Sequence, residues 1–141
     1  MTGPTYRFSS DTAEMDRELT HRWLSEQSYW AKGRSRDVHE RAMDASLNFG
    51  MFDEATGAQV AFARVITDGA TFAWLADVFV DESVRGRGVG IALMEGIMAI
   101  VEPMDLKRVG LVTADAHELY AKFGFGPLKD PDWHMARVRA S

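Results

Sequence analysis

Cysteine is absent from this sequence, and histidine occurs only four times. Disulfides, thiolate nucleophiles and Cys-ligated metal sites are therefore excluded, and the spacing of the histidines suggests no metal ligation. The sequence also lacks the run of about 18 apolar residues that a membrane-spanning helix needs, and residues 1–7 lack the pattern of a signal peptide. We therefore expect a cytoplasmic protein without a bound metal and without a membrane partner.

A surplus of positive charge is missing as well, because 16 Lys and Arg residues face 21 Asp and Glu residues, for a net charge of -5. This balance argues against a surface that neutralises many phosphates, so we expect no nucleic-acid partner. The 141 residues are 46% hydrophobic and 26% charged, which provides enough apolar material for an ordinary core. We predict a single domain spanning residues 1–141.

The spacing of apolar residues predicts a mixed α/β chain around one sheet. Strands are expected at 5–8, 47–52, 60–66, 71–80, 108–113 and 133–138. Helices are expected at 12–27, at a shorter stretch that Asp37 caps, at 91–101 and at 115–123. The tight turn at Asp68-Gly69 makes the two strands on either side of it antiparallel neighbours.

A glycine-rich segment, Arg85-Gly86-Arg87-Gly88-Val89-Gly90, lies between an expected strand and an expected helix. Such a segment directs backbone N–H groups and the positive end of a helix dipole at an anion, and the two arginines add charged donors. It has no Gly-Lys-Ser/Thr, so it is not a nucleotide-hydrolysing P-loop, and Ile91 occupies a position where a dinucleotide fingerprint needs glycine. A phosphate group of another ligand is the predicted occupant.

The same six residues resemble the R/Q-x-x-G-x-G/A pyrophosphate loop of the GCN5-related N-acetyltransferase (GNAT) family, and they follow the strand Val78-Phe79-Val80-Asp81, as in that family. About thirty residues later, the stretch from Ala116 to Phe125 is similar to the family's second signature, a short helix with A-x-x-x-Y that ends in Gly-Phe. The resemblance implies a mixed, largely antiparallel central sheet flanked by helices. It also implies acyl transfer from acetyl-CoA, the co-substrate, to an amine.

The resemblance further implies roles for individual residues. The backbone of Val78, Phe79 and Val80 would pair with the pantetheine arm, and Tyr120 would lie beside the thioester sulfur. The pyrophosphate cradle would consist of Arg85, Gly86, Arg87, Gly88, Val89 and Gly90. One position departs from the pattern, because Thr113 stands where many members have asparagine.

Acyl transfer to an amine requires that the amine lose a proton and that the departing thiolate gain one. Tyr120 is protonated at neutral pH and is the predicted acid. The predicted base is Asp77, a lone acid in the apolar run 72–80, which strand alternation places alongside Leu75 and Phe79. We expect an apolar setting to raise its pKa, and action through a water would suit its short side chain. The alternative is that Asp77 only anchors a neighbouring backbone N–H group or arginine.

The segment 28–36 connects the first two expected helices and carries Tyr29 and Trp30 together with three cations, Lys32, Arg34 and Arg36. In the resembling family this connection lines the acceptor cleft, so Tyr29 and Trp30 are the expected substrate-binding residues. An acceptor with an aromatic or anionic part is compatible with them. The alternative is that the cations are simply solvated.

These observations predict an N-acetyltransferase that acts on a primary amine of a small molecule or peptide. Without cysteine and without a G-x-S-x-G serine, direct attack in a ternary complex is preferred over a covalent acyl-enzyme. One alternative is a non-catalytic acyl-CoA-binding or sensing module, and another is an interaction domain that uses the segment 28–36. The sequence leaves open the acceptor, the acyl-chain length and whether the chain forms a homodimer.

Overall fold

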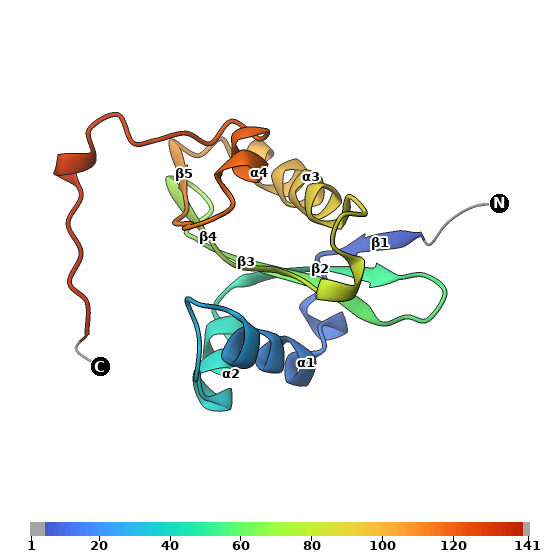
Figure 1. Ribbon diagram of the computed structural model, residues 1–141. Coiled ribbons are helices and arrows are strands. Elements are labelled where there is room, and N and C mark those ends of the chain that lie inside the picture. Colours follow the sequence, from blue (N-terminus) through green and yellow to red (C-terminus); the bar gives the residue numbers. More distant parts are fainter. Residues whose placement is uncertain (1–4, 140–141) are drawn as a thin grey trace.

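A five-stranded sheet organises the computed structural model, which describes residues 5–139 (Figure 1). Its strands follow the chain order β1-β2-β3-β4-β5. They span Tyr6–Ser9, Leu47–Asp53, Gln59–Thr67, Phe72–Val80 and Arg108–Gly110. The first four strands are antiparallel neighbours, whereas β5 runs parallel to β4. The predicted mixed, largely antiparallel sheet is therefore confirmed.

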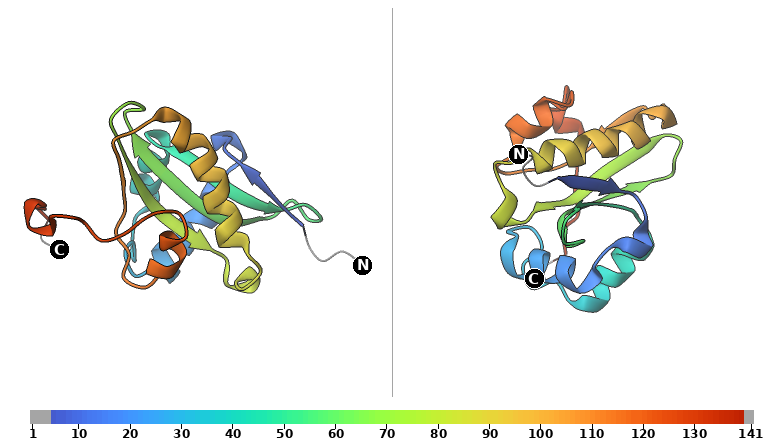
Figure 2. Two further views of the ribbon diagram at one scale, coloured as in Figure 1. Left: turned by 90° about the horizontal axis from the view of Figure 1, so that it is seen from above. Right: turned by 90° about the vertical axis from the view of Figure 1, so that its right-hand side faces the viewer.

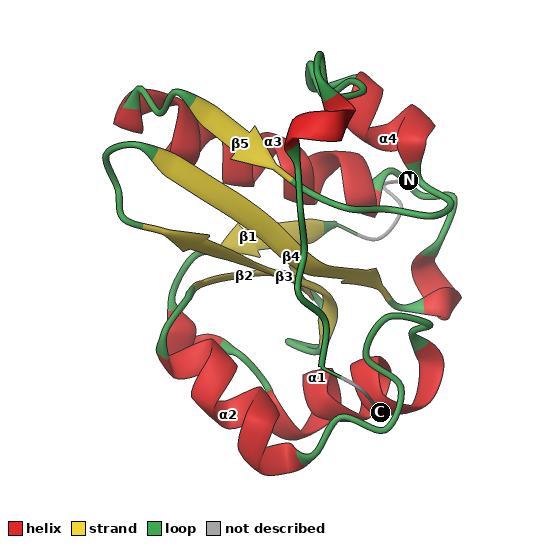
Figure 3. Cartoon of the chain, turned by 90° about the vertical axis from the view of Figure 1, so that its left-hand side faces the viewer, coloured by secondary structure: helices red, strands yellow, loops and turns green. Residues whose placement is uncertain are grey.

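Helices cover both faces of this sheet (Figure 2). The helices α3 (Val89–Val101) and α4 (His117–Ala121) lie on one face, and α1 (Arg17–Arg22) and α2 (Arg36–Asp44) lie on the other (Figures 1 and 3). On the α3 face, one side of the helix packs on alternate residues of the central strands. The fully buried members of this core include Phe49, Ala61, Ala63, Val65, Ala73, Leu93, Met94 and Ile97.

The opposite face has a smaller apolar cluster under α1 and α2. It consists of Met15, Trp23, Leu24, Ala31, Met43, Phe52, Phe62 and Phe79. Polar side chains are buried beside this cluster, and His39 of α2 shares a hydrogen bond with Thr20 of α1 at 2.9 Å. The two helices are thus joined to the sheet and to each other by both apolar and polar contacts.

The expected helix over 12–27 is divided into three pieces. Asp11 caps only a 3-10 turn (Thr12–Glu14), since Met15 is extended, and Asp16 caps the start of α1 by accepting from the backbone N–H of Leu19. A π-helical turn, Trp23–Gln27, ends the run. The second helix begins earlier than expected because Ser35, and not Asp37, caps it.

A β-bulge interrupts β4 at Asp77, whose backbone has a φ of 56°. Phe62 pairs with Phe79 and Arg64 pairs with Ala76, so β4 has one residue more than β3 across this interval. Because of the extra residue, side chains before and after the bulge alternate between the faces in opposite phase. Leu75 packs in the α3 core, whereas Phe79 packs in the cluster on the other face. We expected Asp77 to lie on the same face of the sheet as Leu75 and Phe79. This expectation is wrong for Leu75, which lies on the α3 face.

The last third of the chain contains less strand than expected. Of the predicted strand over 108–113, only Arg108–Gly110 pairs with β4, and the predicted helix over 115–123 is limited to His117–Ala121. The predicted strand over 133–138 is wrong. Residues 131–139 are exposed, begin with a 3-10 turn (Pro131–Trp133) and extend away from the sheet (Figure 2). Among residues 5–139, none of the helices is long and apolar enough to cross a bilayer.

Candidate active site

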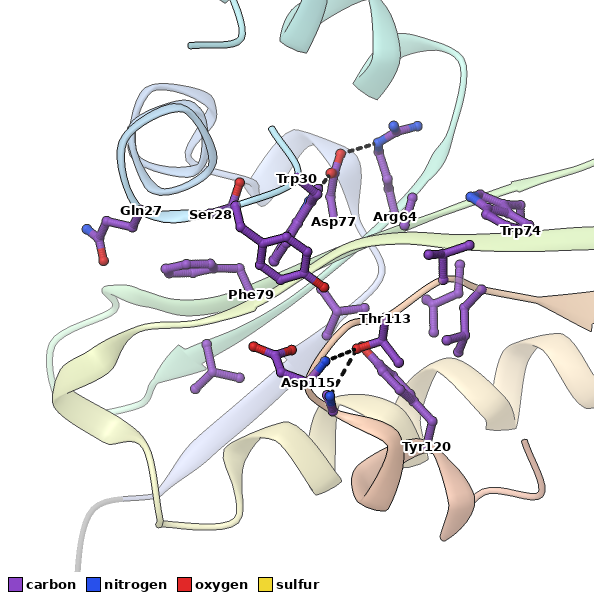
Figure 4. Close-up of a pocket in the computed structure, with 18 of the residues that line it drawn as sticks. Gln27, Ser28, Trp30, Arg64, Trp74, Asp77, Phe79, Thr113, Asp115 and Tyr120 are labelled. Atoms are coloured by element: carbon purple, nitrogen blue, oxygen red, sulfur yellow. Dashed lines mark hydrogen bonds and ion pairs between the residues drawn. The ribbon is translucent and has the colours of Figure 1, made fainter. Parts of the chain in front are cut away.

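A cavity of about 520 Å³ lies where β4 and β5 separate (Figure 4). The two strands pair at Phe72, Ala73 and Trp74 of β4, before the bulge, and their pairing ends there. Beyond the bulge the walls of the cavity are β4, the segment after β5 and the segment between α1 and α2. They contribute Gln27, Ser28, Tyr29, Trp30, Arg34, Arg64, residues 74–80, Arg85, residues 111–113, Asp115, Ala116 and Tyr120.

A second cavity of about 270 Å³ adjoins the first, since Val80 and Arg85 line both. Gly86 and Gly88 have φ values of 82° and 77°, a left-handed conformation that glycine adopts without strain. Gly88 caps α3, which begins at Val89, so the amides of the first helical turn lack intrahelical partners. The glycine-rich segment therefore lines a cavity at the N-terminus of a 13-residue helix, and the binding of an anion there stays a prediction.

The two arginines of the glycine-rich segment have different positions. Arg85 lies at the junction of the cavities, where its Nε donates to the Val80 carbonyl oxygen at 3.0 Å and its guanidinium stacks 5.4 Å from the Phe79 ring centre. Arg87 lines neither cavity, and its Nη1 donates to the Tyr6 hydroxyl at 3.4 Å. Arg85 is thus the better placed of the two for an anion.

Asp77 is the centre of a buried polar cluster on the α1–α2 side of the larger cavity. Its Oδ2 accepts from Arg34 Nη1 at 2.7 Å and from Arg64 Nε at 2.6 Å, and its Oδ1 accepts from Trp30 Nε1 at 2.8 Å. Burial raises the pKa of the Asp77 carboxyl, but the hydrogen bonds and charges of Arg34 and Arg64 outweigh it and lower this pKa below its usual value. The expected apolar setting with a raised pKa is therefore wrong.

Tyr120 lies across the cavity from Asp77, on α4, and only 8% of it is exposed (Figure 4). Its ring packs edge-to-face on Phe125. Burial, together with the nearby Tyr29 and Asp115, raises the pKa of the Tyr120 hydroxyl to about 12. This hydroxyl is therefore protonated at neutral pH and can donate a hydrogen bond.

The two expected substrate-binding aromatics both line the larger cavity. Their rings meet edge-to-face at 5.0 Å. The hydroxyl of Tyr29 accepts from the backbone N–H of Ala114 at 2.7 Å, which bridges the α1–α2 segment and the segment after β5. Thr113, the position that departs from the family pattern, lines the cavity and accepts from the N–H groups of Asp115 and Ala116.

Arg64 is a site residue that the sequence did not reveal. It is a single cation within the apolar strand β3, and Asp77 is a single acid within the apolar strand β4. Two lone opposite charges in neighbouring antiparallel strands are a signal for pairing, but the bulge shifts their register by one residue. Trp74 was also missed, because its apolar ring is typical of a core residue and the opening of the sheet beside it is not visible in the sequence.

No group of three or more His, Asp or Glu side chains in residues 5–139 is arranged to hold a metal ion. Among the residues described, the larger cavity is lined by three guanidiniums, two carboxylates and two phenols, which belong to Arg34, Arg64, Arg85, Asp77, Asp115, Tyr29 and Tyr120. The smaller cavity adds the backbone amides at the start of α3.

Comparison with known proteins identifies the arrangement. A family model described as the acetyltransferase (GNAT) family matches residues 17–125. A crystal structure from Xanthomonas campestris pv. campestris, of a protein assigned as a GNAT acetyltransferase, is 46% identical, with a TM-score of 0.91 over 98% of this chain and 96% of that chain. A Gibberella zeae protein assigned as an acetyltransferase is 28% identical over 135 residues, which cover 83% of this chain and 76% of that protein.

A more distant structure, Rv2747 from Mycobacterium tuberculosis, was determined in complex with CoA. It is 17% identical, covers 89% of this chain and 74% of that chain, and has a TM-score of 0.71, which shows a shared fold alone. Since the family model spans most of the chain and includes both cavities, the chain belongs to the GNAT acetyltransferase family and is an acetyl-CoA-dependent N-acyltransferase.

Proposed function

We propose that this enzyme transfers an acetyl group from acetyl-CoA to a primary amine of a small molecule or peptide, by direct attack in a ternary complex. The observation that carries the proposal is the junction of the two cavities at Val80 and Arg85. It joins an anion cradle at one end to a phenol, Tyr120, facing an aromatic and charged wall at the other.

The cradle residues support acetyl-CoA as the co-substrate. The amides at the start of α3 and the guanidinium of Arg85 would hold the pyrophosphate, and added side chains at Gly86 or Gly88 would extend into the space around the loop. Beyond the bulge, the backbone groups of Val78, Phe79 and Val80 on the β5 side have no strand partner in the described sheet. They would pair with the amide groups of the pantetheine arm.

The amine nitrogen would attack the thioester carbonyl, so that a C–N bond forms and the C–S bond breaks. The amine loses one proton, and the CoA thiolate gains one. Tyr120 would donate a hydrogen bond to the sulfur as negative charge develops there. Since its pKa near 12 lies well above the roughly 8.5 of a thiol, this hydrogen bond stabilises the thiolate, and the proton from the amine restores the thiol.

The Asp77 cluster would position the acceptor. An ionised carboxylate with a lowered pKa is a weak base, and only 2% of the Asp77 side chain is exposed. Its contacts hold Trp30, Arg34 and Arg64 against the cavity. Since one carboxylate offsets the charge of one guanidinium, the cluster of Asp77, Arg34 and Arg64 keeps a net positive charge. Proton removal by Asp77 through a water stays a prediction. The cytoplasmic setting and the single domain over 1–141 also stay predictions.

The proposal is tested by measuring CoA release from acetyl-CoA with a panel of primary amines that includes amino acids, polyamines and peptides. We expect turnover with at least one acceptor, and an Arg85→Ala variant whose affinity for acetyl-CoA, measured by calorimetry, is weaker by about 1.5–3 kcal/mol. Arg87→Ala is the matched control, because Arg87 lines neither cavity. Tight binding without turnover on any amine would favour a sensing module, and unchanged affinity in Arg85→Ala would contradict the cradle.

A further inference from the structure

Two cations of the larger cavity, Arg34 and Arg64, have hydrogen-bonding capacity that the described residues do not use. Arg34 donates through Nη1 to Asp77, and Arg64 donates through Nε to Asp77 and through Nη1 to Ser46 Oγ at 3.2 Å. Within residues 5–139, no oxygen accepts from the remaining guanidinium nitrogens, Nε and Nη2 of Arg34 and Nη2 of Arg64. None of these nitrogens is among the buried polar atoms without a partner, so they are accessible, and both residues line the cavity.

The orientation of both guanidiniums is already set. Asp77 Oδ2 accepts from both of them, and the backbone of Arg34 is held at two points. Its N–H group donates to the Ala31 carbonyl oxygen at 3.0 Å, and its carbonyl oxygen accepts from His21 Nε2 at 2.7 Å. A ligand that meets these side chains would therefore cost little conformational entropy in ordering them.

The charges in this cluster do not balance. The side chains of Arg34 and Arg64 are only 17% and 13% exposed, and Asp77 offsets the charge of one of them. An unpaired charge at such a position is costly, and a second negative group from a ligand would remove that cost. The planar fork of a guanidinium matches the oxygens of a carboxylate or a phosphate. The free N–H groups therefore favour an oxyanion at this end of the cavity.

The opposite end of the cavity has the opposite charge. Asp115 and Tyr120 lie there, on the segments that follow β5 (Figure 4). The carboxylate of Asp115 would attract an ammonium group toward the Tyr120 hydroxyl. Between the two ends the lining includes the apolar surfaces of Tyr29 and Phe79. The cavity is therefore suited to a molecule with a negative end, an apolar middle and an amine.

We propose that the acceptor is a small molecule that carries a primary amine and an oxyanion, either a carboxylate or a phosphate, and that Arg34 and Arg64 bind the oxyanion through their free N–H groups. The cavity volume of about 520 Å³ is in the range typical of small-ligand sites. This inference rests on the proposed function, because it names the acceptor class for the same cavity. Polyamines are poor acceptors under it, since their second cation would face the two guanidiniums.

The first test measures CoA release with acceptors that are matched in size and differ in charge. One set is δ-aminovalerate, pentylamine and cadaverine, a second is phenylalanine and phenethylamine, and a third is phosphoethanolamine and ethanolamine. In at least one set we expect kcat/KM for the oxyanion-bearing amine to exceed that of its match without the oxyanion by about 10–100-fold, mainly through KM. The set with the largest ratio distinguishes a carboxylate from a phosphate. Turnover in which no oxyanion-bearing amine exceeds its match would overturn the inference and leave the proposed function intact.

The second test uses this specificity ratio in variants. Arg34→Gln and Arg64→Gln should each lower the ratio toward one, whereas a purely structural defect would lower kcat/KM for both members of a set equally. Arg34→Lys and Arg64→Lys keep the charge beside Asp77, so they provide the measurement if a glutamine variant does not fold, and their ratios should be intermediate. Arg41→Gln is the matched control, because Arg41 is exposed on α2 and pairs with Asp37. An unchanged ratio in the arginine variants would overturn the inference.

The third test detects the oxyanion without turnover. The Trp30 indole N–H group donates to Asp77 beside the guanidiniums, so its NMR resonance should shift when hydrocinnamate, valerate or inorganic phosphate is added to the enzyme saturated with CoA. The chain has four tryptophans, and Trp30→Phe assigns the signal. The shift should be lost in Arg64→Gln and kept in Arg41→Gln. A shift without CoA release from any amine would contradict the proposed function and support the oxyanion site, whereas no shift with any of the three anions would overturn that site.

Discussion

The two faces of the sheet are built differently. On the α3 face, among the described residues, the buried cluster consists of apolar side chains together with Tyr120, whose ring lines the larger cavity. On the α1–α2 face the apolar cluster is interrupted by buried polar side chains. Among the described residues these include Thr20, Ser28, His39, Asn48, Gln59 and Asp77.

This difference separates stability from chemistry. An apolar core stabilises without reference to pH, whereas buried charges and imidazoles make stability depend on their protonation. The α3 face therefore anchors the fold and the helix that begins at the smaller cavity. The α1–α2 face holds the charged wall of the larger cavity, and its stability should be sensitive to pH.

The largest effect is expected at Tyr120, where the two faces meet across the cavity. Tyr120→Phe keeps the ring against Phe125 and removes the hydroxyl, so we expect turnover to fall by about 10²–10⁴. Steady-state kinetics with acetyl-CoA measure this, and the affinity for acetyl-CoA should change little. A decrease below tenfold would make Tyr120 a packing residue.

On the α3 face, Leu93→Ala removes a fully buried side chain from the apolar core. We expect the free energy of unfolding to fall by about 2–5 kcal/mol, by the same amount at pH 5 and pH 7. Urea unfolding at both pH values measures it. A loss that changed with pH would show that a titrating group contributes to the stability of this face, which would contradict the difference between the two faces.

On the opposite face, Asp77→Asn leaves Arg34 and Arg64 without their negative partner. We expect a loss of about 3 kcal/mol at pH 7. Since the folded state lowers the pKa of Asp77, its contribution is present above the unfolded value of about 3.8 and is lost as the pH falls further. Melting temperatures from pH 7 to pH 3 should therefore fall less steeply in this variant.

The same variant separates two roles of Asp77 in the reaction. If Asp77 is the base, the acidic limb of the pH profile of kcat/KM flattens in Asp77→Asn and the remaining rate rises as free amine accumulates. If Asp77 only positions Trp30 and the two arginines, the profile keeps its shape while KM for the amine increases. An unaltered profile removes proton transfer by Asp77 from the mechanism.

The smallest effect is expected at His39, which is fully buried beside Thr20. Burial, with the nearby charges of Arg34 and His21, lowers the pKa of His39 to about 4. Its neutral form therefore stabilises the fold above pH 6.5, and this contribution decreases by about 2 kcal/mol between pH 7 and pH 5. His39→Gln should remove that dependence in urea unfolding, whereas His134→Gln, at an exposed position, should not.

Most of the fold could be predicted from local patterns in the sequence. The three central strands and α3 have strong apolar periodicity, and the turn at Asp68-Gly69 sets their neighbours correctly. The left-handed backbone of the loop before α3 could be predicted because it requires glycine, which the sequence shows directly, while its role as an anion cradle stays a prediction.

The errors share a physical origin in tertiary contacts. The helix over 12–27 breaks because Asp16 caps a new start and Glu14 binds Arg7 and Ser9, partners outside the helix. The strand over 133–138 does not form because no described strand pairs with it, and a strand pattern alone does not show whether a pairing partner exists. The predicted rise in the pKa of Asp77 was wrong because Arg34 and Arg64, from distant segments of the chain, bind its carboxylate.

The bulge at Asp77 also limits how β4 can evolve. At a φ of 56° glycine, asparagine and aspartate are the residues with the least strain, and of these only aspartate brings a negative charge to the two guanidiniums. Deletion of one residue at the bulge would restore regular alternation and turn the side chains beyond it to the opposite faces. Phe79 would then point into the α3 core and Val80 would leave it. Insertions and deletions in β4 should therefore be tolerated less well than substitutions, while the exposed turn at residues 54–58 should accept length changes readily.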